Sequence, residues 1–155
     1  MQRKHQGRGR REEHHNLRQG AEDPFSYWRR LPPEDLDRQR RAKLAGSISR
    51  LASIFPNWQA AMAGDAGAAV GIVLRLRPPF HISWRVDLAM SLLLNCAFEN
   101  ASAALVLSHA LRRMQIARNR RMQLADSWLK YNARRAAPRP QLKSGSKRRI
   151  RRHVN

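Results

Sequence analysis

Hydrophobic positions recur at helical spacing on either side of an apolar centre. One stripe, with members three or four residues apart, comprises Leu44, Ile48, Leu51 and Phe55. This spacing predicts a helix that opens at Pro32 and Pro33 and ends at Pro56, because proline is tolerated in the first turn of a helix and interrupts its interior. Residues 112–137 contain neither Gly nor Pro and predict a further helix. The pattern therefore favours an all-α fold.

The apolar centre, residues 57–114, contains two stretches that are similar to each other. Residues 64–77 and 99–112 align at an offset of 35, and this alignment pairs Asp65 with Asn100. Each of these side chains can cap a helix, because its oxygen can accept from the free N–H groups of the first turn. One interpretation is a small domain of stacked helical hairpins, built from a degenerate two-helix repeat of about 35 residues. The alternative is that any two alanine-rich helices behind an N-cap align this well.

One stretch of the centre is long enough to require comparison with a membrane span. Residues 88–111 carry no basic side chain, and their Leu, Val and Phe side chains favour insertion. Glu99 at the midpoint, together with Asn100 and His109, opposes insertion and brings the sum close to zero. We therefore do not expect membrane insertion, and we predict a helical hairpin with its polar corner at Glu99 and Asn100.

Three segments of different composition predict the domain organisation. Residues 1–24 are polar and basic and should form a disordered N-terminal tail, because they contain too little apolar surface to order themselves. Residues 25–137 should form the helical domain, with its core in residues 57–114 and a basic helix at residues 112–135. Residues 138–155, which include the run KRRIRR, should form a disordered basic C-terminal tail.

A cluster of aromatic side chains lies where the helical domain begins. Residues 25–31 (FSYWRRL) combine three aromatic side chains with two arginines. Such a cluster can stack on exposed bases while arginine contacts phosphate. We favour the alternative, in which the cluster is an anchor that packs onto the helical domain.

Positive charge is concentrated in the C-terminal third of the chain. The formal net charge is +20, from 31 basic and 11 acidic residues, and Asp126 is the one acidic residue after position 111. The apolar centre, in contrast, is nearly neutral. This distribution favours a polyanionic partner, with nucleic acid first and an anionic membrane surface second.

The candidate phosphate-binding residues are the arginines and lysines of the basic helix and of the C-terminal tail. Arginine suits two-pronged contact with phosphate, and a basic helical face can follow a phosphate backbone. The predicted nucleic-acid-binding residues are Arg112, Arg113, Arg118, Arg120, Arg121, Lys130, Arg134, Arg135, Lys147, Arg148, Arg149, Arg151 and Arg152.

No constellation of residues with catalytic spacing is present. Asp65 and Asp87 lie where helices should begin, which gives them structural roles, and no phosphate-cradling glycine loop or zinc-type spacing occurs. Cys96 is the one cysteine, so an intramolecular disulfide is excluded, and no spacing supports a Cys96–His109 dyad. We expect a protein that is not an enzyme and that uses neither a metal nor a cofactor.

Two functional hypotheses follow from these patterns. The first is a non-enzymatic accessory protein that binds nucleic acid, either RNA or DNA, through the basic helical face and the tails, with weak sequence preference. The second is a helical-repeat protein-interaction module whose groove lies between Trp58 and Trp128 and takes an acidic or helical protein partner. No apolar run follows the basic N-terminus, so we expect a cytoplasmic location.

Overall fold

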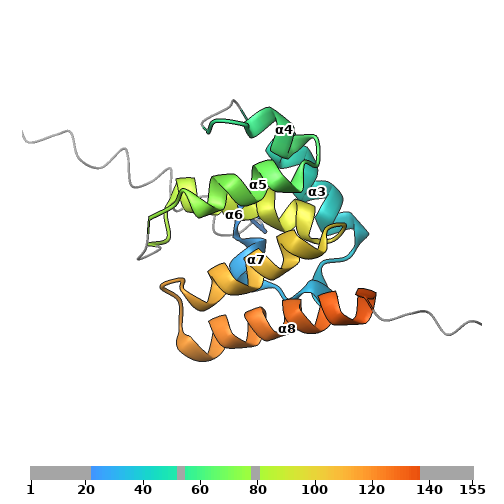
Figure 1. Cartoon of the computed structure of the whole chain (residues 1–155), viewed down its shortest axis with the longest axis vertical. Helices are drawn as coiled ribbons and strands as arrows, with labels where there is room; N and C mark the ends of the chain where they lie inside the picture. The colour runs from blue at the N-terminus through green and yellow to red at the C-terminus, as the bar shows by residue number, and fades with distance from the viewer. Residues whose placement is uncertain (1–21, 52–54, 78–80, 137–155) are drawn as a thin grey trace, which may run out of the picture.

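Helices account for the regular structure of residues 22–51, 55–77 and 81–136, which are the residues that the computed structural model describes (Figure 1). These ranges form an all-α domain of seven α-helices and two short 3-10 helices, without a β-strand. In chain order the elements are η1 (Pro24–Ser26), α2 (Tyr27–Arg30), η2 (Pro33–Asp35), α3 (Arg38–Ser49), α4 (Trp58–Met62), α5 (Ala66–Leu74), α6 (Trp84–Ala97), α7 (Ala101–Arg112) and α8 (Arg118–Ala136).

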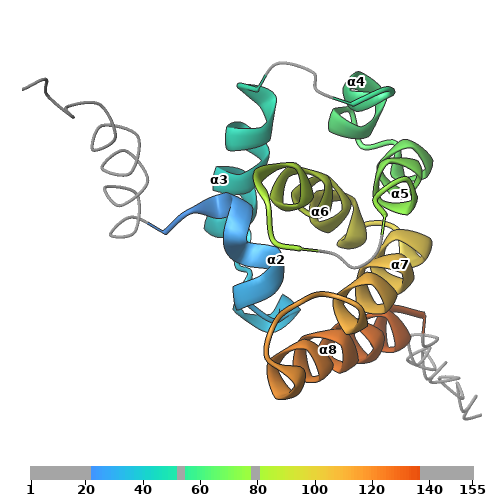
Figure 2. The same cartoon turned by 90° about the vertical axis from the view of Figure 1, so that its left-hand side faces the viewer.

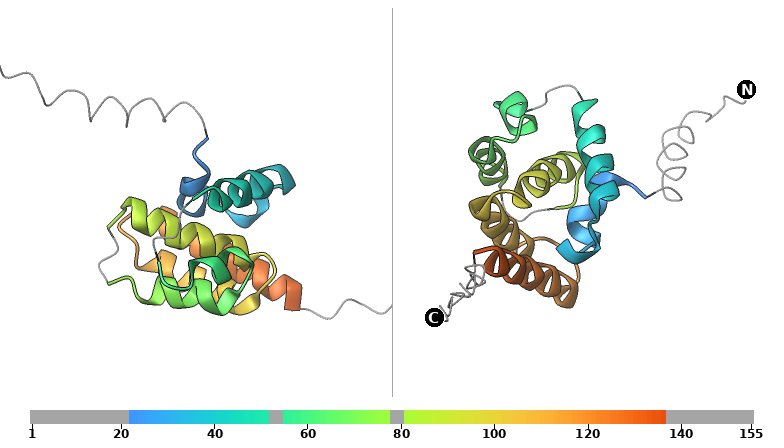
Figure 3. Two further views of the ribbon diagram at one scale, coloured as in Figure 1. Left: turned by 90° about the horizontal axis from the view of Figure 1, so that it is seen from above. Right: turned by 90° about the vertical axis from the view of Figure 1, so that its right-hand side faces the viewer.

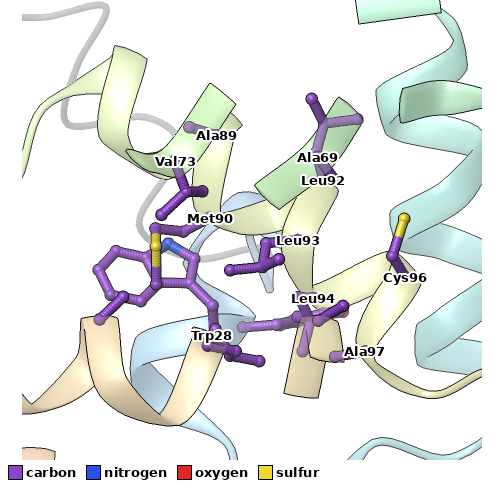
Figure 4. Close-up of a cluster of buried hydrophobic side chains, with 14 of the residues drawn as sticks. Trp28, Ala69, Val73, Ala89, Met90, Leu92, Leu93, Leu94, Cys96 and Ala97 are labelled. Carbon is purple, nitrogen blue, oxygen red and sulfur yellow. The ribbon is translucent and has the colours of Figure 1, made fainter. Parts of the chain in front are cut away.

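Helix α6 lies at the centre of the fold, and the other helices are arranged around it (Figure 2). Every side chain from Val86 to Leu94 is buried, because α6 is apolar on nearly all of its faces and can be covered on all of them. The core side chains gather around it, with Trp28 from α2 and Ala69 and Val73 from α5 (Figure 4). The core therefore extends beyond residues 57–114 into the helices before and after them.

Two predicted helix caps are confirmed. Asp65 Oδ1 accepts from the backbone N–H of Ala68 at 3.1 Å at the start of α5, and Asn100 Oδ1 accepts from that of Ala103 at 3.0 Å at the start of α7. Gly64 precedes the first cap with a φ of 95°, a left-handed conformation that costs glycine little. The helices before the two caps differ in length, with five residues in α4 and fourteen in α6.

The predicted hairpin at residues 88–111 is confirmed. α6 ends at Ala97, α7 begins at Ala101, and the polar corner lies between them. Within the described ranges, no helix combines the length and the apolar character that a membrane crossing requires.

The aromatic cluster at residues 25–31 is the anchor that we favoured. Phe25, Tyr27 and Trp28 are buried, and Trp28 Nε1 donates to Asp87 Oδ1 of α6 at 3.0 Å. Arg29 Nε donates to the same carboxylate oxygen at 3.1 Å. Two long-range bonds to one carboxylate therefore fix this segment on the central helix.

The folded domain begins earlier than the predicted boundary. Glu22, which we assigned to the tail, pairs with Arg40 of α3 at 3.1 Å, and Asp23 caps η1 by accepting from Phe25 N. Residues 1–21 of the predicted N-terminal tail lie outside the described residues.

The predicted helix start at Pro32 and Pro33 is wrong. Pro33 opens only the short η2, and α3 begins at Arg38 because Asp37 caps it and accepts from Arg40 N at 2.8 Å. Leu44 and Ile48 are buried in α3, which confirms this part of the predicted apolar stripe.

The helix predicted from residue 112 is in fact divided between α7 and α8. α7 continues to Arg112, residues 113–117 reverse the chain, and α8 begins at Arg118. This reversal lets α8 pack beside α7, where Ser108 Oγ donates to the carbonyl oxygen of Ala125 at 2.8 Å. No Gly or Pro marks the reversal in the sequence. We therefore attribute it to the packing of α8 against α7 rather than to local propensity.

The buried face of α8 also differs from the prediction. Ala125 and the preceding Met114 are buried as expected, whereas Ala117 is exposed and the main core contacts are Leu124 and Trp128. Trp58 and Trp128 are both buried, at 1% and 0% exposed, so they do not line a surface groove as the second hypothesis required.

Candidate nucleic-acid interface

Four helix ends meet at one end of the bundle. Successive helices from α5 to α8 run in opposite directions across the view of Figure 1. The C-termini of α5 and α7 therefore lie at the same end as the N-termini of α6 and α8. A small cavity of about 110 Å³, lined by Leu76 beyond α5 and by His109 and Arg113 near the end of α7, confirms that these segments are neighbours. We call this region, made of residues 74–77, 81–87 and 109–121, the basic end.

The basic end is rich in cations and has one carboxylate. That carboxylate, Asp87, is buried and is bonded to Trp28 and Arg29. Figure 2 looks onto this end, with the N-terminus of α6 in its middle. The arginines of the basic end are Arg75, Arg77, Arg85, Arg112, Arg113, Arg118, Arg120 and Arg121, accompanied by His81 and His109.

Three of these arginines hold other parts of the fold. Arg112 pairs with Asp126 of α8 at 2.6 Å. Arg120 donates to the backbone oxygen of Arg30 at the end of α2, and Arg121 donates to that of Met114, just beyond α7, at 3.1 Å. A guanidinium at a helix C-terminus satisfies carbonyl groups that have no partner within the helix. These side chains therefore have a structural role.

The other arginines of the basic end point their charge toward the surface. Arg75, Arg77, Arg113 and Arg118 are exposed, and they come from three different helix ends. Arg85 is also exposed, and its guanidinium carbon lies 5.3 Å from the centre of the Phe55 ring. Because no exposed carboxylate comes from the segments of the basic end, their fields add rather than cancel.

The remaining candidates of α8 lie toward the opposite end of the bundle. We call that end the corner end; it contains the N-terminus of α5, residues 98–100 and the C-terminus of α8 (Figure 3). Lys130 and Arg134 are exposed, whereas Arg135 donates to the backbone oxygens of Phe98 and Glu99. Arg118 and Arg134 are separated by about 24 Å of helix. The predicted single basic face is therefore two separate groups of charges.

A cleft of about 860 Å³ lies at the corner end, between α3 and residues 98–100. Its charges are mixed, because Arg38 and Arg41 line it together with Glu99. The guanidinium of Arg41 already lies over the Phe98 ring, 4.5 Å from its centre. The cleft is thus less suited to a polyanion than the basic end is.

The predicted tail residues Lys147, Arg148, Arg149, Arg151 and Arg152 lie outside the described residues. Sequence reasoning also missed Arg75, Arg77, Arg85 and the half-exposed Trp84 as parts of one surface. The alternating direction of the helices could have predicted this grouping, because every second connection in such a bundle lies at the same end.

The residues considered for catalysis are separated or buried. Cys96 lies near the end of α6 at the corner end, whereas His109 lies at the basic end, so they form no dyad. Burial, and then the nearby charge of Asp65, raise the pKa of the Cys96 thiol, which keeps it protonated at neutral pH. Among the described residues, no three His, Cys, Asp or Glu side chains are grouped so that they can hold a metal ion.

A comparison with protein-family models, curated proteins and solved structures found no match for this chain.

Proposed function

We propose that this protein is a non-enzymatic accessory protein that binds nucleic acid through phosphate contacts at its basic end. The observation that carries the proposal is the presence of eight arginines at several helix ends of the basic end, whose own segments hold one carboxylate, the buried Asp87, while Asp126 of α8 pairs with Arg112. Surface charge of one sign draws a polyanion from a distance and raises the rate of association. The basic segment around Lys147 and Arg152 would add further phosphate contacts.

The helix N-termini at the basic end add to the attraction for phosphate, and the neighbouring C-termini of α5 and α7 offset part of it. α6 and α8, with fourteen and nineteen residues, both have their N-termini at the basic end. A helix N-terminus carries partial positive charge and N–H groups that can donate to a phosphate oxygen. Arg118 occupies the first position of α8, so its charge and the helix dipole act on the same anion.

Salt dependence gives a quantitative expectation for this mode of binding. Each phosphate that is neutralised contributes about −0.7 (single strand) or −0.9 (B-form duplex) to the slope of log affinity against log salt concentration. Replacing Arg75, Arg77 and Arg118 together by Gln should therefore reduce the slope by about 2 to 3. Binding at near-physiological salt should weaken correspondingly.

The test compares two triple variants of the full chain. The first is Arg75→Gln, Arg77→Gln and Arg118→Gln, and the control is Arg38→Gln, Lys43→Gln and Arg50→Gln on α3, which removes the same charge from another surface. Fluorescence anisotropy is measured with a labelled RNA hairpin, single-stranded DNA and duplex DNA across a salt series. Loss of binding only in the first variant supports the proposal. Equal losses in both would show that the net charge, rather than the basic end, accounts for binding.

The second candidate is a protein-interaction module, and one observation favours it. Leu74 of α5 and Leu105 of α7 are 69% and 53% exposed, and they offer an apolar contact on two neighbouring helices. Leu74→Ser with Leu105→Ser tests it, with capture of an acidic or helical protein partner as the readout. Nucleic-acid binding that survives this change, together with lost partner capture, would show that Leu74 and Leu105 serve the protein partner, although Leu74 itself lies in the basic end.

A further inference from the structure

One tryptophan of this protein is exposed, and it lies within the basic end. Trp84 is 48% exposed, whereas Trp28, Trp58 and Trp128 are at most 1% exposed. Trp84 is the first residue of α6, and the N-terminus of this central helix lies at the basic end (Figure 2). Exposing an indole forgoes a large apolar contribution to stability, so packing alone does not explain this position.

The indole is held in place on one side. The rings of Trp84 and Phe25 meet edge to face, with centroids 5.1 Å apart and planes at 78°. Phe25 is itself buried, and its backbone oxygen accepts a hydrogen bond from Ser91 Oγ of α6 at 3.3 Å. A ring that is fixed on one side and open on another loses little freedom when a flat ligand stacks on it.

The residues around Trp84 in the basic end are complementary in charge to a nucleotide. Arg85 follows it in the chain, and the exposed His81 and Ile82 precede it. Arg75 and Arg77 lie at the same end of the bundle, and the segments of the basic end expose no carboxylate there. An aromatic ring at the same end of the fold as several cations supplies the groups that bind single strands, in which a base stacks on the ring and phosphates contact the cations.

We propose that Trp84 stacks on an unpaired base of single-stranded nucleic acid whose phosphates are held by arginines of the basic end. The inference rests on the proposed function and narrows it to strands with accessible bases. A base within a duplex is covered by its neighbours above and below, so it offers no free face to Trp84. Duplex DNA can then use only the phosphate contacts.

The experiment uses the full chain, its variants Trp84→Ala and Trp84→Phe, and four labelled probes. The probes are oligo-dT and oligo-U of about 12 nucleotides, an abasic strand of equal length, and a duplex of equal length. Trp84→Ala should weaken binding to oligo-dT and oligo-U by about 5- to 150-fold, and Trp84→Phe should restore most of the loss, because phenylalanine also presents a flat ring. Affinity for the duplex should stay within about twofold of the unchanged chain.

The abasic strand tests the same contact without altering the protein. It keeps the phosphates and lacks the bases, so the unchanged chain should bind it about as weakly as Trp84→Ala binds oligo-dT. Stacking should also quench the Trp84 fluorescence when oligo-dT binds, and Trp84→Phe should lose that quenching while it keeps its affinity. A comparison of oligo-dT with oligo-U separates DNA from RNA as the source of the base.

Two results would overturn the stacking inference and leave the proposed function intact. One is an unchanged affinity of Trp84→Ala for oligo-dT and oligo-U, and the other is an equal loss for single strands and duplex. The proposed function itself fails if the unchanged chain binds no probe at near-physiological salt, and the stacking inference then fails with it. Far-UV circular dichroism and thermal melting check that both variants keep the fold.

Discussion

Two tryptophans make almost the same contact with a phenylalanine at the two ends of the bundle. Trp128 meets Phe98 near the corner end with ring centroids 5.1 Å apart and planes at 66°. Trp84 meets Phe25 at the basic end with the same separation and planes at 78°. Trp128 is also in contact with Tyr131, at 5.5 Å between centroids, and is buried, whereas about half of Trp84 is exposed.

Arginines also take both roles, and both roles occur at each end, since Arg112, Arg120 and Arg121 at the basic end hold other parts of the fold. At the corner end, Arg135 donates to the carbonyl oxygens of Phe98 and Glu99, and Arg41 lies over an aromatic ring. At the basic end, Arg75 and Arg118 are exposed. The comparison teaches that the place of a residue relative to the core, more than its type, decides whether it stabilises the fold or is available to a ligand.

The largest expected effect is a difference in the free energy of unfolding between alanine variants of the two tryptophans. Trp128→Ala should lower the free energy of unfolding by about 3–5 kcal/mol, because it leaves a cavity under α8. Trp84→Ala removes a half-exposed ring and should lower it by about 0.5–1.5 kcal/mol, mainly through the lost contact with Phe25. Urea denaturation of both variants measures the difference. Equal losses would contradict the division of roles between the two ends.

The next effect concerns the carboxylate of the basic end. Asp87→Ala should lower the free energy of unfolding by about 2–3 kcal/mol, since Trp28 Nε1 and the Arg29 guanidinium both lose their acceptor. Asp87→Asn keeps one carbonyl oxygen for Trp28 and should recover part of the loss. Urea denaturation again gives the values, and a harmless Asp87→Ala would show that the anchor holds by apolar packing alone.

A smaller effect separates two arginines of α8. Arg135→Gln should lower the free energy of unfolding by about 0.5–1.5 kcal/mol, because the carbonyl groups at the end of α6 lose their donor. Arg118→Gln should change it by less than about 0.5 kcal/mol in either direction, since this exposed cation lies at the positive end of its helix. Thermal melting detects the contrast, and nucleic-acid binding should respond in the reverse order.

The smallest effect is a pH dependence at the start of the folded domain. The Arg40 guanidinium donates a hydrogen bond to the exposed Glu22 carboxylate and, with its charge, lowers the pKa of that group below its ordinary value. A lowered pKa stabilises the fold above the pKa of the unfolded chain, and the contribution is lost as the pH falls through the folded value. Glu22→Gln should therefore lower the melting temperature by about 1 °C near pH 7.

At sufficiently low pH the same substitution should have no effect, because Glu22 is then protonated in the folded and unfolded chains alike. Thermal melting of the unchanged chain and of Glu22→Gln at both ends of the range provides the check. A difference that persists at low pH would assign the effect of the substitution to something other than this ion pair.

Much of the fold was predictable because local chemistry marks it. Asp65 and Asn100 are short polar side chains before alanine-rich stretches, and they cap α5 and α7 as their chemistry requires. The candidate site was less predictable, because it depends on which helix ends meet. The reversal at residues 113–117 has no local mark, and it places the helix ends that carry Arg113 and Arg118 at the same end of the bundle as the end of α5.

Sequence periodicity also could not reveal that Trp84 is exposed. Trp84 begins a helix in which every side chain from Val86 to Leu94 is buried, so an aromatic residue at its start would be expected in the core. Only the arrangement of the neighbouring helices leaves this end of α6 open.

The central position of α6 sets the order in which the chain can fold as it is synthesised. Trp28, Leu44 and Ile48 leave the ribosome well before residue 84, and the helix against which they are buried is made later. Until α6 emerges, the growing chain carries an apolar stripe beside clustered positive charge, with Asp87 not yet present to accept from Trp28. The first half of this protein therefore depends on the second half to become a folded structure.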